Sequence, residues 1–398
     1  MMVQMTRRML GATDLRLLWK FGWNFGVQGI LSVQRFKRQL RRGISFPPFL
    51  NISLTSGCNL RCQGCWVDVD LPPRHLPLED MNRMIDSARR HGNRFFGLLG
   101  GEPFLHPQLF ELLAAHPDCY FQIFTNGQLI TGEVAARLRK LGNATPLVSV
   151  EGDAVVSDER RGRPQVFAKT LRGLDACVKE RLITGVASSV CRNNIDYLLS
   201  EAWLDELLRR GVGYVFYYTY RPVGAQPRPE LALDPEQVLR LRRFCVEMRT
   251  RKPIGIIDAY WDDEGRALCP AAVGLGYHIS PGGDIEPCPI VQLAGAKITD
   301  NGGDIFKTIT EAAYLREFRA LAAGATRGCI VLERPDLLRE FALRHRLRDT
   351  TVRQTVLAEL AAMQPRGSQS TPGREVPEEA WPYRFAKKHW FFGFGAYS

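Results

Sequence analysis

Between residues 49 and 218, short apolar runs alternate with helix-like segments. The apolar runs favour strands, which we expect at residues 49–54, 94–99, 120–125, 147–150, 184–190 and 213–218. The segments between them favour helices, which we expect at residues 78–90, 108–115, 132–141, 167–179 and 201–210. This alternation predicts an α/β fold in which parallel strands are joined by crossover helices.

The stretch before the first expected strand has its own pattern. Residues 15–33 are mostly apolar, but Lys20, Asn24, Gln28 and Ser32 recur every four residues and predict one polar stripe on a helix. The apolar run is too short and too interrupted to span a bilayer. Two interpretations remain open, namely a helix packed on the folded domain and a helix lying on a membrane surface.

Composition and charge narrow the class of protein. With 398 residues and 45% apolar composition, the chain can bury a large core and is long enough for two domains. The net charge of +11 arises partly from a basic cluster after the amphipathic stretch, namely Arg35, Lys37, Arg38, Arg41 and Arg42. No recognised nucleic-acid motif accompanies this charge, so we do not expect nucleic acid as a partner.

Cysteine usage bears on location. Most of the ten cysteines are scattered and no secretory signal precedes them, so they do not resemble a disulfide framework. We therefore expect a cytoplasmic protein, with peripheral contact to the inner membrane surface if the amphipathic stretch lies on a membrane.

Three cysteines are closely spaced on the loop after the first expected strand. Cys58, Cys62 and Cys65 have the spacing C-x3-C-x2-C. Three thiolates at this spacing suit three corners of an iron–sulfur cube, whose fourth iron then has no protein ligand. The alternatives are a structural zinc site, for which His75 is the nearest histidine, and three unrelated core cysteines.

This spacing is similar to the signature of the radical S-adenosylmethionine (radical SAM) superfamily. The resemblance implies a partial (β/α)6 barrel with its chemistry at the C-terminal ends of the strands. It also implies a [4Fe-4S] cluster whose free iron binds S-adenosylmethionine, and a reductant such as flavodoxin or ferredoxin. The reduced cluster cleaves the sulfonium, and the resulting 5'-deoxyadenosyl radical removes a hydrogen atom from the substrate.

Two further motifs resemble the cofactor pocket of this superfamily. Gly100, Gly101, Glu102 and Pro103 follow the second strand and resemble a signature whose backbone approaches the methionine amino group, because glycine permits such an approach. Thr125 and Asn126, with Gly127, match a short motif after the third strand, and the alternative is an ordinary Asn-Gly turn.

The end of the fourth strand and one tryptophan complete the expected cofactor pocket. Ser149 and Glu151, followed by Arg161, resemble a family pattern that has Asp where this chain has Glu151. They are expected to contact the cofactor's sugar or the substrate, and the alternative is a polar strand end. Trp66 stands where the family often has an aromatic residue near the adenine, although ordinary core packing explains it as well.

A second group of cysteines lies in the C-terminal part of the chain. Cys269 and Cys288, with a Gly-x4-Cys pattern at the latter, resemble the start of a SPASM or Twitch extension. We expect one auxiliary cluster held by Cys269, Cys288 and Cys329, with a non-cysteine fourth ligand or an open iron. The alternative is a turn-rich hairpin with buried cysteines. The others, Cys119, Cys177, Cys191 and Cys245, are expected in the core.

The expected domain organisation has four parts. Residues 1–48 form a basic amphipathic segment, 49–230 the partial barrel, 231–334 a smaller auxiliary-cluster domain, and 335–398 C-terminal helices and an aromatic tail. Disordered segments are rarely so aromatic as residues 381–398, so we expect the tail to dock on the barrel, over its mouth. A membrane surface shared with the first helix is the alternative. Residues 364–377 are the expected linker before it.

The substrate is the least determined part of the prediction, because one fold supports many reactions. The basic amphipathic start and the aromatic end favour a lipid-like substrate met at a membrane surface. One alternative is a peptide-modifying maturase. Another is a non-catalytic iron–sulfur electron-transfer protein, against which the motifs at residues 100–103 and 125–127 argue.

Overall fold

The computed structural model of the chain describes residues 2–69 and 72–390. Its main sheet has nine strands in the order β7-β6-β5-β4-β3-β2-β1-β8-β9, and β10 pairs with β11 in a second sheet. Strands β1 to β7 are parallel, which confirms the predicted α/β fold with a partial barrel. The strands are β1 (Phe49–Ser53), β2 (Phe95–Leu99), β3 (Tyr120–Thr125), β4 (Ala144–Ser149), β5 (Gly185–Val190), β6 (Tyr214–Thr219), β7 (Gly255–Asp258), β8 (His278–Ile279), β9 (Ile285–Glu286), β10 (Leu293–Ala294) and β11 (Arg348–Asp349).

The main sheet includes strands from beyond residue 230 that the hydrophobic pattern did not predict. β7 adds a seventh parallel strand, with Gly255 opposite Tyr214 of β6. β8 pairs in parallel with β1 on the other side, where His278 lies opposite Asn51. β9 then pairs with β8 in the antiparallel sense. The C-terminal part of the chain therefore contributes to the barrel sheet, and the expected domain boundaries stay a prediction.

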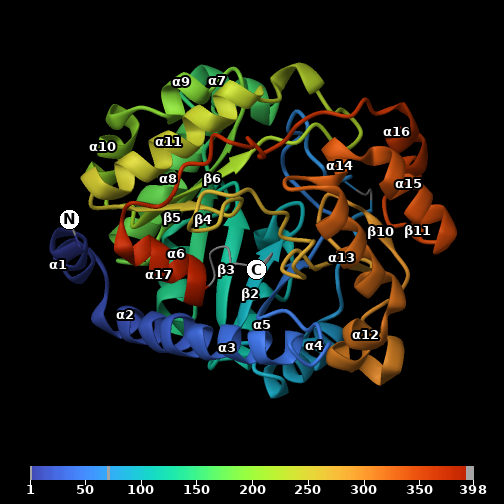
Figure 1. The fold of residues 1–398 in the computed structure, drawn as a ribbon. Helices are drawn as coiled ribbons and strands as arrows, with labels where there is room; N and C mark the ends of the chain where they lie inside the picture. The colour runs from blue at the N-terminus through green and yellow to red at the C-terminus, as the bar shows by residue number, and fades with distance from the viewer. Residues whose placement is uncertain (1, 70–71, 391–398) are drawn as a thin grey trace.

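Helices cover the outside of the sheet (Figure 1). Those between the strands are α4 (Leu78–Arg90), α5 (Leu109–Ala115), α6 (Gly132–Leu141), α7 (Ala154–Arg161), α8 (Val166–Lys179), α9 (Ile195–Leu198), α10 (Glu201–Arg209) and α11 (Pro235–Arg251). Those of the C-terminal part are α12 (Ile305–Glu311), α13 (Ala313–Ala325), α14 (Ile330–Glu333), α15 (Pro335–Arg344), α16 (Val356–Ala362) and α17 (Trp381–His389). In α4, Met81, Met84 and Ile85 are buried because their spacing matches the helical period.

Local capping fixes where several of these helices begin and end. The Thr131 hydroxyl accepts a hydrogen bond from the backbone N–H of Val134 at the start of α6. Gly142 ends that helix with a φ of 73°, a conformation that favours glycine. At the start of α11, the side chains of Asp234 and Gln237 form a capping box.

The N-terminal segment folds into α1 (Met2–Ala12), α2 (Leu15–Phe21), the π-helix η1 (Gly22–Val27) and α3 (Gln28–Leu40). These helices cross the sheet at the end where its strands begin, drawn in blue along the lower side of Figure 1. The Phe25 ring lies 4.7 Å from that of Phe95 and 6.1 Å from that of Tyr120. The interpretation as a helix packed on the folded domain is therefore confirmed.

The polar stripe of this segment faces the barrel. The Lys20 ammonium donates a hydrogen bond to the Leu141 carbonyl at 2.7 Å, where it also caps the C-terminus of α6. The Ser32 hydroxyl donates to the Pro48 carbonyl at 3.1 Å, and Asn24 is buried. The apolar positions on the opposite side are consequently turned outward. Among the described helices, none is both long and apolar enough to cross a membrane.

The described part of the aromatic tail docks beside the N-terminal helices. The Trp390 indole N–H donates a hydrogen bond to the Phe25 carbonyl at 3.0 Å, and the Lys37 ammonium donates to the Lys388 carbonyl at 2.5 Å. Docking on the barrel is thus confirmed. For the described residues 381–390 the expected place over the barrel mouth is wrong, because α17 lies at the end of the sheet where the strands begin (Figure 1). The tail residues Phe391, Phe392, Phe394 and Tyr397 lie outside the described residues.

A buried ion network holds α17 against β7 and α11. The Asp258 carboxylate accepts hydrogen bonds from Arg242 at 3.0 Å and Arg249 at 2.8 Å. Its other oxygen accepts one from Lys387 at 2.7 Å. Glu378 pairs with the same two arginines, and all five side chains are at most 1% exposed. Because buried charges are tolerated only when they are paired, this network fixes the C-terminal segment in place.

The expected linker at residues 364–377 contains no helix or strand, as predicted, yet it is fixed to the body of the protein. Gln369 is fully buried. The Ser368 hydroxyl accepts a hydrogen bond from the Cys329 N–H at 2.8 Å, and the Val376 carbonyl accepts one from Arg242 at 2.8 Å. The segment is therefore an ordered strap that passes next to Cys329.

Candidate functional site

The loop that carries Cys58, Cys62 and Cys65 lies at the C-terminal end of β1, where the loops after β2, β3 and β4 meet it. From the β2 loop, the Gly101 N–H donates to the Thr55 carbonyl at 2.8 Å. From the β3 loop, the Asn126 amide donates to the Asn59 side chain at 2.7 Å. The Gln63 N–H donates to the Arg160 carbonyl of α7 at 2.8 Å. The predicted motifs therefore converge, because parallel strands end at one rim.

Glycines permit this close packing around the cysteine loop. A Cβ on Gly101 would lie 2.1 Å from the Gly57 carbonyl oxygen. Gly64, between Cys62 and Cys65, has a φ of 64°, and a Cβ there would lie 1.8 Å from the Tyr220 hydroxyl. A side chain at Gly101 would have to displace loop backbone, and one at Gly64 would have to displace the Tyr220 side chain. The approach seen for Gly101 is to this loop, and its approach to a ligand stays a prediction.

We expect Gly101→Ala to destabilise the protein by about 1–3 kcal/mol, because the added methyl group has to displace backbone next to Cys58. Chemical unfolding at equilibrium measures this loss. Gly132→Ala is the matched control, since a Cβ there meets nothing within 4 Å and the residue is the first of α6. Equal unfolding midpoints for the two variants would contradict the packing described here.

Glu102 joins the second and third motifs from a fully buried position. Its carboxylate accepts hydrogen bonds from the Thr125 hydroxyl and the Asn126 N–H, both at 2.8 Å, and from the Phe104 N–H at 3.2 Å. Burial raises the pKa of Glu102 to about 7, although these hydrogen bonds oppose the shift. Its described contacts support a role in positioning the loops around the cysteines.

An ion cluster from the β4 end borders the first cysteine group. The Arg161 guanidinium lies 3.7 Å from the Cys62 sulfur and pairs with Glu151. Arg160 donates to the other oxygen of Glu151 at 3.0 Å. The thiolate is the form of cysteine that ligates metals, and burial opposes it at Cys58, whose pKa it raises to about 11.

The second cysteine group is assembled from three separate segments. Cys269 precedes β8, Cys288 follows β9, and Cys329 caps the start of α14. Burial and, to a smaller extent, the nearby thiol of Cys329 raise the pKa of Cys269 to about 11. The three expected auxiliary ligands therefore lie in one neighbourhood.

Arg221 faces the second cysteine group and was not predicted as a site residue. Burial opposes its charge, but Cys329, Tyr260 and Cys288 raise its pKa above the ordinary value. Its guanidinium lies 4.7 Å from the centre of the Tyr260 ring and donates to the Thr219 hydroxyl at 2.6 Å. The only sequence signal for Arg221 was its place just after β6, at the rim that carries the other motifs.

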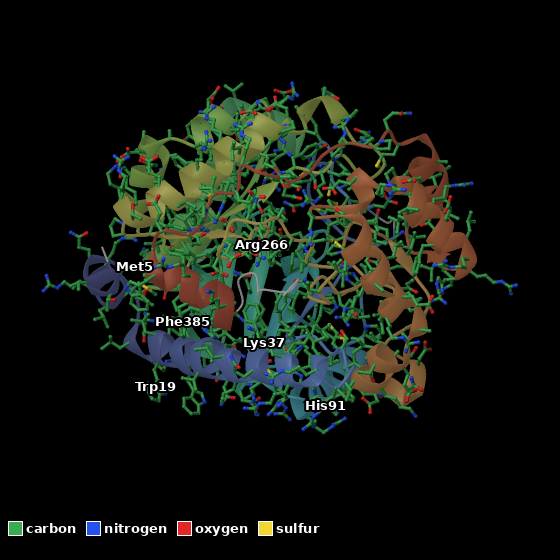
Figure 2. The ribbon with its side chains drawn as sticks, in the orientation of Figure 1. Met5, Trp19, Lys37, His91, Arg266 and Phe385 are labelled. Carbon is green, nitrogen blue, oxygen red and sulfur yellow. The ribbon has the colours of Figure 1, made fainter. Side chains whose placement is uncertain are left out.

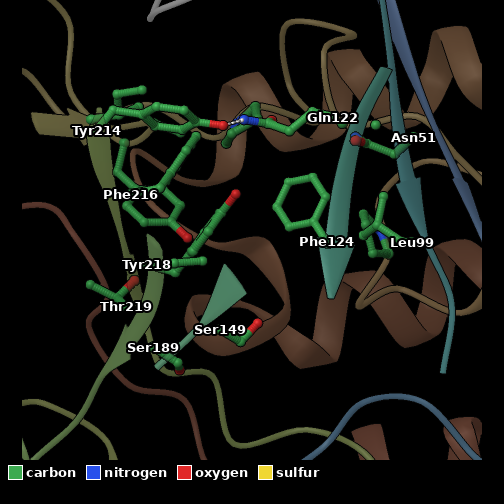
Figure 3. Close-up of a pocket in the computed structure, with 18 of the residues that line it drawn as sticks. Asn51, Leu99, Gln122, Phe124, Ser149, Ser189, Tyr214, Phe216, Tyr218 and Thr219 are labelled. Atoms are coloured by element: carbon green, nitrogen blue, oxygen red, sulfur yellow. Dashed lines mark hydrogen bonds between the residues drawn. The ribbon is translucent and has the colours of Figure 1, made fainter. Parts of the chain in front are cut away.

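Both cysteine groups line one cavity of about 710 Å³. Cys62 and Cys65 border it on one side, and Cys269, Cys288 and Cys329 border it on another. The side chains between them are mostly aromatic and apolar, with Ser149, Ser189 and Thr219 among the polar exceptions (Figure 3).

Aromatic side chains from β3 and β6 fill much of the wall in Figure 3. Phe216 and Tyr218 stack with ring centres 4.3 Å apart. The Gln122 amide donates to the Tyr214 hydroxyl at 3.0 Å and so bridges the two strands across the lumen. Beyond this bridge the cavity ends against the N-terminal helices, at Met5, Met9, Phe21 and Phe25.

The predicted site residues fall into two sets. Trp66, Ser149 and Glu151 line the cavity together with five of the six expected cysteine ligands. Trp66 also contacts His278 edge-on, with ring centres 5.3 Å apart. The other predicted residues are not part of the cavity lining, and among them Gly101 and Asn126 donate hydrogen bonds to the cysteine loop. They are Cys58, Gly100, Gly101, Glu102, Pro103, Thr125 and Asn126.

The residues around the first cysteine group fit an iron–sulfur cluster and a polar cofactor. Three thiols lie on one loop, and buried polar atoms beside them lack partners within the described chain, namely Gln63 Oε1 and Gln128 Nε2. In the part of the chain that the structure describes, no group of three or more His, Cys, Asp or Glu side chains has the geometry of a site for a single metal ion. The assignment of individual ligands stays a prediction.

Comparison with known proteins extends this picture. The sequence model of the radical SAM superfamily matches residues 52–215. The AdoMet-dependent heme synthase of Methanosarcina barkeri is 28% identical over 213 residues, which are 52% of this chain and 60% of that protein. The mycofactocin maturase MftC of Mycolicibacterium smegmatis is 29% identical over 329 residues, which are 76% of this chain and 80% of MftC.

Solved structures share the fold. Streptococcus suis SuiB bound to S-adenosylmethionine superposes with a TM-score of 0.60 at 19% identity, over 71% of this chain and 70% of SuiB. The protein anSMEcpe, solved with bound AdoMet and a peptide, gives a TM-score of 0.55 at 19% identity, over 70% of this chain and 84% of its own. Together with the converging motifs, the family match shows a radical SAM domain at residues 52–215, and the similarity to MftC covers more of the chain than this domain.

Proposed function

We propose that this protein generates a radical from S-adenosylmethionine at Cys58, Cys62 and Cys65 and uses it on a substrate held in the central cavity. The observation that carries the proposal is that one cavity is bordered by both cysteine groups. A molecule in the cavity can therefore contact the region of the first group and the region of the second at once.

When bound, a [4Fe-4S] cluster supplies one electron that splits S-adenosylmethionine into methionine and a 5'-deoxyadenosyl radical, which takes a hydrogen atom from the substrate. Arg161 and Glu151 form an ion pair beside Cys62. Glu102 holds the loops after β2 and β3 together through its hydrogen bonds. The aromatic cavity wall excludes water from the place where a radical would form. The electron donor in this proposal is a flavodoxin or ferredoxin.

The second cysteine group is proposed to hold one auxiliary iron–sulfur cluster. Cys269, Cys288 and Cys329 border the cavity, so this cluster would face the substrate. Arg221 supplies a positive charge next to the three thiolates and offsets part of their negative charge. The strap residue Ser368 fixes the backbone of Cys329.

A lipid-like substrate is our proposal for what enters the cavity. Phe124, Phe216 and Tyr218 line its middle, and methionine and phenylalanine side chains close its far end. Apolar walls of this kind favour an apolar ligand with few polar groups. A peptide substrate is the second candidate, because MftC is named as a maturase and SuiB has been solved with its precursor peptide SuiA.

The proposal is tested by release of 5'-deoxyadenosine. Anaerobically reconstituted protein is mixed with dithionite and S-adenosylmethionine, and the nucleoside is quantified by chromatography. We expect release by the wild type and by Cys177→Ala, a buried helix residue away from the cavity, and none by Cys62→Ala. Iron-loaded wild type that releases no more than Cys62→Ala would favour an electron-transfer protein instead. Faster release with a membrane-lipid extract than with a peptide mixture would support the lipid-like substrate.

A further inference from the structure

The outer side of the N-terminal helices carries a row of exposed apolar side chains. Leu15, Trp19, Trp23, Val27 and Leu31 recur every four residues from α2 through η1 into α3, and they are 65%, 72%, 49%, 44% and 55% exposed. The rings of Trp19 and Trp23 stack 6.5 Å apart. Figure 2 shows Trp19 on the side of α2 that points away from the rest of the molecule. A contiguous exposed apolar row of this kind marks an interaction surface.

The π-helix keeps this row on one side. In a regular α-helix, residues spaced by four drift around the axis by about 40° per step, so the four steps between five of them would spread the row over about 160°. The wider turn of η1 (Gly22–Val27) reverses the drift in the middle of the row. As a result, Trp23 and Val27 stay on the same outer side as Leu15 and Trp19.

Within the helices that carry the row, every charged residue is basic. Residues 15–67 contain no Asp or Glu. The four-residue spacing continues from Leu31 to Arg35, and Arg38, Arg41 and Arg42 follow on exposed positions. None of these four arginines forms an ion pair with another described residue. A row of apolar side chains next to unpaired basic ones is complementary to a layer with an anionic surface and an apolar interior.

The opposite side of the same helices meets the cavity. Met5 and Met9 of α1, Phe21 of α2 and Phe25 of η1 line the end of the cavity that lies farthest from the cysteines. One layer of helix therefore separates the exposed row from the interior of the barrel. This arrangement places an apolar external surface next to an apolar internal space.

We infer that α2, η1 and α3 form a docking face for the surface of an anionic lipid bilayer. The tryptophans and aliphatic side chains of the row enter the boundary between headgroups and acyl chains, and Arg35, Arg38, Arg41 and Arg42 contact anionic headgroups. The docking itself needs no radical chemistry. Its link to a lipid-like substrate rests on the proposed function.

Vesicle flotation of the full-length, cluster-loaded protein tests this inference without S-adenosylmethionine or reductant. The probes are vesicles of phosphatidylcholine alone and of phosphatidylcholine with phosphatidylglycerol, at low and high salt.

We expect the wild type to float with the anionic vesicles at low salt, and we expect the bound fraction of Trp19→Gln/Trp23→Gln to be at least tenfold smaller. Arg35→Gln/Arg38→Gln/Arg42→Gln should lose the preference for anionic vesicles. The control Val155→Gln/Leu343→Gln removes two equally exposed apolar side chains elsewhere and should float like the wild type.

Three outcomes would overturn the inference. The first is a wild type that does not float with anionic vesicles at low salt. The second is flotation of the tryptophan variant to the same extent as the wild type. The third is a concentration-dependent dimer in sedimentation experiments that the tryptophan variant abolishes, because the row would then join two copies of the chain. None of these outcomes affects 5'-deoxyadenosine release, so the docking face and the proposed chemistry fail independently.

Discussion

Replacing Cys58, Cys62 and Cys65 together by alanine should lower the iron content of the reconstituted protein from about eight atoms per chain to about four. The three thiols lie on one loop and two of them border the cavity, so their removal deletes one complete cluster site. The second group, formed by Cys269, Cys288 and Cys329, stands on other segments and should keep its own cluster. Iron and acid-labile sulfide measured after anaerobic reconstitution give the result.

The reciprocal variant completes this experiment. Alanine at Cys269, Cys288 and Cys329 should also leave about four irons, whereas Cys177→Ala should leave about eight, since Cys177 is buried in α8 away from both groups. If the wild type binds only about four irons and the first variant binds none, the second group is structural and the auxiliary-cluster assignment is wrong. Full iron content in the first variant would instead remove the basis of the proposed function.

Asp258→Asn should destabilise the protein by about 3–5 kcal/mol, the cost of breaking a buried ion network on one side. Asp258 accepts hydrogen bonds from Arg242, Arg249 and Lys387. When asparagine replaces it, Glu378 is the one remaining carboxylate in the described chain that pairs with these three buried cations. Chemical unfolding at pH 7 measures the loss. The surface variant Asp196→Asn, which breaks an ion pair between an 85% and a 50% exposed side chain, should change stability by less than about 1 kcal/mol.

The pH dependence of the Asp258→Asn effect follows from the direction of the pKa shift. Burial opposes ionisation of Asp258, but Arg249, Lys387 and Arg242 outweigh it and lower the pKa below the ordinary value of 3.8. A lowered carboxyl pKa contributes stability above that ordinary value and loses it as the pH falls. The difference between wild type and variant should therefore be the same at pH 5.5 and at pH 8. A difference that narrows at pH 5.5 would show that Asp258 is not held ionised.

Most barrel strands were predictable because each is a short run of mainly apolar residues between two helix-like segments. The β3 run coincides with the observed Tyr120–Thr125, and β1, β2, β5 and β6 differ from the predicted ranges by a residue at one or both ends. β4 begins at Ala144, three residues earlier than predicted, because Ala144, Thr145 and Pro146 give a weak strand signal. β7 and β8 were missed because strands of four and two residues leave no periodicity to recognise.

Periodicity also left the orientation of the N-terminal helices open. The repeat of Lys20, Asn24, Gln28 and Ser32 identified a polar stripe, but only the tertiary contacts show that Lys20, Asn24 and Ser32 face inward. The reason is local. The backbone carbonyls of Leu141 and Pro48 need hydrogen-bond donors at that surface, and the side chains of Lys20 and Ser32 provide them. The apolar side was left outward by the same contacts.

The parts of the candidate site that consist of neighbouring residues in the sequence were predictable. The parts that folding assembles from distant segments were harder to predict. The cysteine loop and the motif at residues 100–103 are local patterns, and the structure brings them together. Arg221 and Ser368 reach the second cysteine group from β6 and from the strap, so no local pattern identifies them. Glu102 was predicted as a cofactor contact, whereas its described hydrogen bonds join two loops.

The meeting of the two chain ends has a consequence for synthesis on the ribosome. The Trp390 indole bonds to the Phe25 carbonyl across 365 residues. At about 5–20 residues per second, Phe25 leaves the ribosome roughly 20–70 s before its partner is made. During that interval the Phe25 ring stays uncovered on the side where Trp390 later packs, so this apolar surface is exposed until α17 is made. Premature termination before residue 381 would make that exposure permanent.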